Sequence, residues 1–180
     1  MDDMERGMSG QVAVIPKGTV IKGNIEIKGQ LEMYGTIQGD IVSNDRVHLC
    51  GNVEGNLTVN ELETKDSFIE GQIKCEQGVA IRENTVVLGN IEAKSLEVDG
   101  AIQGNLDIKG NITVGAQAII DSDIKAKTIK VTNGAALHGN CSLCYADIDL
   151  NQMFPETKKA KVVNGTEKLQ AKEKNRRNVS

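Results

Sequence analysis

The chain has 180 residues, a net charge of −4 and 19 glycines, but only two tyrosines, two phenylalanines and no tryptophan. Aromatic rings supply much of the buried area of ordinary cores and of sites for bases, sugars or quaternary amines, so this composition argues against such sites. Isoleucine and valine number 34 against 11 leucines, which favours strands over a helical bundle.

Residues 1–13 are predicted to be a disordered tail, with Met1, Met4 and Met8 as candidate membrane-contact residues. The acidic start lacks the basic-then-apolar layout of a secretory signal. No apolar run is long enough for a membrane-spanning helix. These features predict a cytoplasmic protein with four free thiols, and leave peripheral contact at the inner face of the membrane as an open alternative.

Glycine recurs at regular intervals from Gly18 to Gly139. The pattern is glycine, a polar residue and then an apolar residue, at steps of 16 for the first four occurrences. These glycines are Gly23, Gly39, Gly55, Gly71, Gly89, Gly104 and Gly139. Apolar residues between them alternate with polar ones, as Ile25 and Ile27 do around Glu26, and this is the pattern of a strand. The sequence therefore predicts an internal repeat of one short unit.

Each unit of 16–18 residues is expected to form one winding of a coil with three short strands and three corners. Glycine relieves the strain of a sharp corner, and successive windings stack as parallel strands about 4.8 Å apart. Inward columns of isoleucine, valine and leucine then fill a narrow triangular bore. The predicted fold class is all-β, a single parallel β-helix (β-solenoid) with about seven windings between Val20 and Cys141.

The two ends of such a solenoid each present a terminal winding with unpaired backbone groups and an apolar cross-section. Stacking on other copies is predicted for at least one end, because no amphipathic capping helix is recognisable on either side. The alternative is that a flanking stretch folds over the end as a cap. The candidate self-assembly residues are Val20, Ile21, Leu137 and Leu143.

Residues 146–180 are predicted to form a C-terminal tail, basic and disordered after Pro155. Eight lysines and arginines against three glutamates give that tail a charge of +5, which leaves −9 on the first 155 residues. An acidic body argues against nucleic acid as a partner. The tail could contact an anionic lipid surface or a polyanion.

The repeat resembles that of the bactofilin family. Its opening, V-I-P-K-G-T-V-I-K-G-N-I-E-I-K-G-Q-L-E-M-Y-G-T-I-Q-G-D-I over residues 14–41, is similar to the start of a bactofilin domain. Its close, N-G-A-A-L-H-G over residues 133–139, is similar to that domain's last winding. The resemblance covers residues 14–145, which are taken as the β-helical domain.

The resemblance implies a right-handed β-helix that polymerises end to end, without nucleotide, into bacterial cytoskeletal filaments. Such filaments scaffold client proteins of cell shape, envelope synthesis, division or motility. Many members bind membrane through a short apolar N-terminal segment. The family often has a phenylalanine that supports assembly at the position filled here by Leu137.

No catalytic, cofactor-binding or metal-binding residues are predicted, and the chain is not expected to be an enzyme. His138 and His48 are interpreted as outward-facing residues of their windings, and Cys141 as a small inward hydrophobe. Cys141 and Cys144 form a single C-x-x-C, which is a weak metal signal without a second pair. Two alternatives remain open: a trimeric hexapeptide-repeat acyltransferase, and a monomeric adaptor that functions through its tail.

Overall fold

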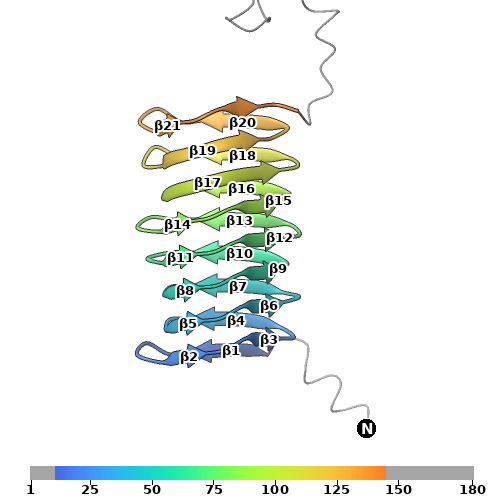
Figure 1. Cartoon of the computed structure of the whole chain (residues 1–180), viewed down its shortest axis with the longest axis vertical. Coiled ribbons are helices and arrows are strands. Elements are labelled where there is room, and N and C mark those ends of the chain that lie inside the picture. The colour runs from blue at the N-terminus through green and yellow to red at the C-terminus, as the bar shows by residue number, and fades with distance from the viewer. Residues whose placement is uncertain (1–10, 145–180) are drawn as a thin grey trace, which may run out of the picture. The chain divides into compact units, whose positions relative to one another are not determined.

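The computed structural model of the chain describes residues 11–144, and every regular element among them is a β-strand. The strands wind upward in chain order as a stack with three faces (Figure 1). All strand pairs are parallel, so the predicted all-β solenoid is confirmed. Strand pairing defines the three faces, called here A, B and C.

Face A is an eight-stranded sheet with one strand from each winding. Its strands in spatial order are β1 (Val12–Ile15), β4 (Gln30–Met33), β7 (Arg46–Leu49), β10 (Glu61–Thr64), β13 (Gly78–Ile81), β16 (Ser95–Val98), β18 (Asn111–Val114) and β20 (Thr128–Val131). The solenoid therefore has eight windings, where about seven were predicted. The difference arises at the start, because Val12–Ile15 pairs with β4 as a full strand of the first winding.

Faces B and C belong to one 14-stranded sheet, because two long strands run through the corner between them. Face B contains β2 (Val20–Lys22), β5 (Thr36–Gln38), β8 (Asn52–Glu54), β11 (Phe68–Glu70), β14 (Val86–Leu88) and β21 (Ala136–His138). Face C contains β3 (Ile25–Ile27), β6 (Ile41–Ser43), β9 (Leu57–Val59), β12 (Ile73–Cys75), β15 (Ile91–Ala93) and β22 (Cys141–Ser142). The strands shared by both faces are β17 (Ala101–Ile108) and β19 (Ile119–Lys125).

The core consists of columns of apolar side chains that run along the solenoid, one residue from each winding. The column on face B contains Ile21, Ile37, Val53, Ile69, Val87, Ile102, Ile120 and Leu137. Its six inner members are buried, with at most 2% of each side chain exposed. Because β-branched residues dominate these columns and stack at the strand spacing, the bore needs no aromatic ring.

The corner between faces B and C explains the repeated glycine. Gly55 has a φ of +151°, and a Cβ on it would overlap the carbonyl oxygen of Gly39 one winding below. Only glycine combines that backbone conformation with so close an approach. The spacing of these glycines along the chain therefore sets the length of each winding.

Candidate functional site: the two ends of the solenoid

The terminal windings differ from the inner ones in backbone pairing. Each strand of faces A, B and C in windings two to seven pairs with a neighbour on both sides. Among the described residues, β1, β2 and β3 at one end and β20, β21 and β22 at the other pair on one side only. Each end therefore presents a set of open strand edges, which are templates for pairing with another chain.

The N-terminal end exposes part of the core cross-section. Five apolar residues of the first winding are only partly buried and pack against the core: Ala13, Ile15, Ile21, Ile25 and Ile27. The residues directly above them in the same columns are buried almost completely, for example Ile37 above Ile21. The first winding therefore carries core side chains that lack a second neighbour within residues 11–144.

The C-terminal end has the same character. Leu137 is 37% exposed, whereas Ile120, its column neighbour one winding below, is 1% exposed. Val131 on face A and Leu143 after β22 are also exposed. The eighth winding thus offers an apolar surface of several aliphatic side chains, and the two ends resemble each other in chemistry.

The four predicted assembly residues lie in the first and last windings, but they differ in the direction that their side chains take. Ile21 and Leu137 are the first and last members of the inward column on face B. Val20 points outward from β2 and is 60% exposed, so it lies at the rim of the N-terminal end. Leu143 lies at the C-terminal end. The methionines proposed for membrane contact, Met1, Met4 and Met8, lie outside the described residues.

Cys141 occupies the inward column above Ile124, as predicted, but its side chain is exposed, unlike the buried members of that column. It is exposed because it belongs to the terminal winding, and no described residue lies beyond it. Cys144 is also exposed. Within residues 11–144, no group of three or more histidine, cysteine, aspartate or glutamate side chains is placed to hold a metal ion.

Both histidines face outward, as predicted. His138 is exposed, and its Nδ1 lies 2.9 Å from Oδ1 of Asp121 in the winding below. That hydrogen bond holds the pKa of Asp121 below its ordinary value. His48 lies between buried Val47 and Leu49 on β7 and contacts the Cys50 sulfur at 3.3 Å.

A ladder of polar side chains follows the corner glycines. In the sequence, only the recurrence of a polar residue at this position points to it. The backbone N–H of Asp40 donates to Oδ1 of Asn24 at 3.1 Å, and that of Asn56 donates to Oδ1 of Asp40 at 2.9 Å. Further steps recur up to the last winding, where the N–H of Asn140 donates to Asp123. The side chain of one winding therefore satisfies the backbone of the next, and Asn140 ends the series.

No helix among the described residues has the length and apolar character needed to cross a bilayer. That finding concerns residues 11–144 alone.

Comparison with known proteins points to one family. Residues 51–142 match a family model described as "Bactofilin: Polymer-forming cytoskeletal". Two relatives from Myxococcus xanthus (strain DK1622) are each 23% identical over 91 residues, which is 51% of this chain: Bactofilin BacO and Bactofilin BacP. The match spans 72% of BacO but only 38% of BacP. No solved structure matches the chain significantly.

Proposed function

This chain belongs to the bactofilin family of polymer-forming cytoskeletal proteins, and we propose that its copies join end to end into filaments without nucleotide and scaffold other proteins. One observation carries the proposal: the columns of core side chains run to both ends of the described solenoid, and their first and last residues are incompletely buried. Ile21 and Leu137 close one such column and are only partly covered, while the six residues between them are buried.

Joining two ends extends the solenoid by its own geometry. Open strand edges gain backbone hydrogen bonds, and the apolar side chains of each terminal winding gain a second neighbour. Completing the burial of one such side chain contributes on the order of 1 kcal/mol. Several such side chains at each end together contribute enough free energy to offset the cost of association. A contact that does not close on itself produces a fibre.

The scaffold part of the proposal assigns client binding to the surfaces that assembly leaves free. These surfaces are the outward positions of faces A, B and C. The segment 146–180, predicted to be a tail that is basic after Pro155, is a second candidate for client binding. A cytoplasmic location fits a cytoskeletal family. Contact of the N-terminal methionines with a membrane surface remains a subsidiary part of this proposal.

Negative-stain electron microscopy of the purified full chain, in buffer without nucleotide, tests assembly directly. We expect filaments whose length increases with protein concentration. Monomeric rods at high concentration across several salt conditions would contradict the proposal, and discrete trimers would revive the acyltransferase alternative.

A pair of neighbouring variants locates the contact. Leu137→Arg places a charge on the apolar end, and we expect it to disperse the filaments, because burying an unpaired charge is costly. Ala136→Arg puts the same charge on the outward side of the same strand, β21, and should leave filaments intact. Circular dichroism should show wild-type strand content for both. Equal filament formation by both variants would move the contact away from Leu137.

A further inference from the structure

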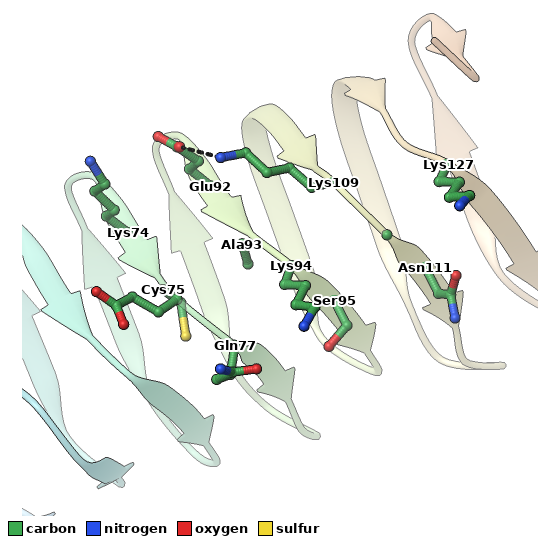
Figure 2. A pocket seen from close by; sticks show the side chains of 12 residues that line it. Lys74, Cys75, Gln77, Glu92, Ala93, Lys94, Ser95, Lys109, Asn111 and Lys127 are labelled. Atoms are coloured by element: carbon green, nitrogen blue, oxygen red, sulfur yellow. Dashed lines mark ion pairs between the residues drawn. The ribbon is translucent and has the colours of Figure 1, made fainter. Parts of the chain in front are cut away.

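A lysine-lined groove runs along the corner between faces C and A, in the half of the solenoid nearer its C-terminal end. Figure 2 shows Lys94, Lys109 and Lys127 on successive windings of this corner, with Lys74 and Glu92 on the neighbouring face C. Ser95 and Asn111 contribute polar groups beside them. The groove has a volume of about 820 Å³ and is open to solvent.

The three corner lysines are held in line by the backbone of the solenoid. The N–H of Lys109 donates to the carbonyl of Ala93, next to Lys94, and the N–H of Lys127 donates to Gly110, next to Lys109. Successive windings lie about 4.8 Å apart, so the backbones of these lysines follow one another at about that spacing along the axis. We call these three residues the lysine ladder.

The lysine ladder is an excess of positive charge on an acidic body. Residues 11–144 carry 12 lysines and arginines against 17 aspartates and glutamates, a net charge of 12 − 17 = −5. Within the ladder only Lys109 has a carboxylate partner among the described residues, Glu92 at 3.7 Å. By contrast, Arg46 on β7 and Arg82 directly after β13 each lie 2.9 Å from a glutamate of an adjacent winding.

At this corner lysine occupies windings five to seven in succession, and it otherwise occurs there only after the first winding, as Lys28, among the described residues. Windings two to four place Asn44, Asn60 and Glu76 there instead of lysine. A fold that needed lysine to turn this corner would carry it in every winding. The ladder is therefore a local feature of the surface, and the fold itself does not require it.

We propose that this groove binds an extended acidic peptide of a partner protein, one rich in aspartate or glutamate. Charge complementarity selects the sign of the partner, and Ser95 and Asn111 offer hydrogen bonds to its backbone. The concave shape favours a peptide over a flat lipid surface. The acidic body and the absence of an aromatic ring from the groove lining disfavour nucleic acid.

Repetition would strengthen a weak contact. Each exposed lysine–carboxylate contact contributes less than about 1 kcal/mol and is screened by salt. A filament would present one groove per copy, so a partner with several acidic segments would bind by avidity. This inference names a client surface for the proposed scaffold and rests on that function for its purpose, but the binding itself does not need a filament.

Fluorescence anisotropy with a labelled octaglutamate peptide and the full-length protein tests the proposal. The groove variant is Lys94→Gln/Lys109→Gln/Lys127→Gln. The matched control, Lys17→Gln/Lys22→Gln/Lys28→Gln, removes as much charge from exposed positions in the first winding and its following corner. We expect about a tenfold weaker affinity for the groove variant and less than a twofold change for the control, with binding lost at high salt.

Equal loss in both variants, or no loss in the groove variant, would overturn the proposal, because the basic C-terminal segment would then account for binding. The proposal would also fall if vesicles containing phosphatidylglycerol bound in a ladder-dependent way while the peptide did not. Electron microscopy of the same variants separates the peptide-binding proposal from the filament-assembly proposal. Filaments from the groove variant together with lost peptide binding support both, and missing filaments in the wild type contradict only the assembly proposal.

Discussion

The inner and terminal windings of this solenoid are built from the same residue types but differ in how completely they are buried. Ile69 in the fourth winding is fully buried, whereas Leu137, in the same column of the eighth winding, is 37% exposed. Backbone pairing differs in parallel, since inner strands pair on two sides and terminal strands on one. The contrast reflects position in the stack alone.

A repeat that buries its core only against its neighbours cannot complete its own ends. The chain has therefore either to cover each terminal winding with another segment or to leave it for a second copy. In a polymer-forming family, a terminal winding that is left uncovered can serve as the contact surface for the next copy. Changes to inner windings should then affect folding, and matching changes to terminal windings should affect assembly.

The largest expected effect comes from a charge in the middle of a column. Ile69→Asp should destabilise the solenoid by at least about 4 kcal/mol, because a carboxylate would be buried without a partner. Phe68→Asp changes the adjacent, outward-facing residue of the same strand, β11, and should cost about 1 kcal/mol or less. Urea unfolding followed by circular dichroism measures both. Similar losses would show that the column is not the main source of stability.

Alanine substitutions of two corner glycines compare the stability of an inner winding with that of a terminal one. Gly55→Ala should cost at least about 3 kcal/mol, since its new methyl group would overlap the carbonyl oxygen of Gly39 at a strained φ. Gly23→Ala also has a strained φ, +131°, but its methyl group would meet open space, so about 1–2 kcal/mol is expected. Thermal unfolding of both in the Leu137→Arg background keeps the chain dispersed. A larger loss at Gly23 would contradict the stacking argument.

The smallest effect concerns His138 and Asp121 near the C-terminal end. His138→Ala removes the hydrogen bond that lowers the pKa of Asp121, so that pKa should rise toward its ordinary value of 3.8. A carboxylate whose pKa is lowered by folding stabilises the fold at pH values above its unfolded-state pKa. That contribution is lost as the pH falls through its folded-state pKa. The gain is small because both side chains are exposed. NMR titration of the carboxyl carbon measures the pKa, and His48→Ala should leave it unchanged.

Much of the fold was predictable because the glycine corners and the apolar columns are periodic. Glycine followed by a polar and an apolar residue marked most windings, and the structure places those residues at one corner. The strand Val12–Ile15 was not counted among the predicted windings because it has no such mark before it, although it pairs with β4. The outward position of Val20 and the inward position of Ile21 depend on the exact register, which two adjacent apolar residues leave open.

The candidate sites were less accessible from sequence. The exposure of Cys141 depends on its being in the last winding, and its column position alone does not show it. The sequence repeat does not reveal the lysine ladder, because Lys94, Lys109 and Lys127 lie 15 and then 18 positions apart, on either side of the usual 16-residue step. Only the strand pairing shows that insertions and deletions elsewhere in each winding bring the three to one corner.

Hydrogen–deuterium exchange of the assembled chain, compared with the dispersed Leu137→Arg variant, tests most directly whether another copy completes the terminal windings. Peptides from the inner windings, such as β8 and β11, should exchange slowly in both samples. Peptides covering β20, β21 and β22 should exchange quickly in the dispersed variant and become protected on assembly. Equal exchange of these strands in the two samples, with filaments present in the wild type, would contradict end-to-end contact at this end.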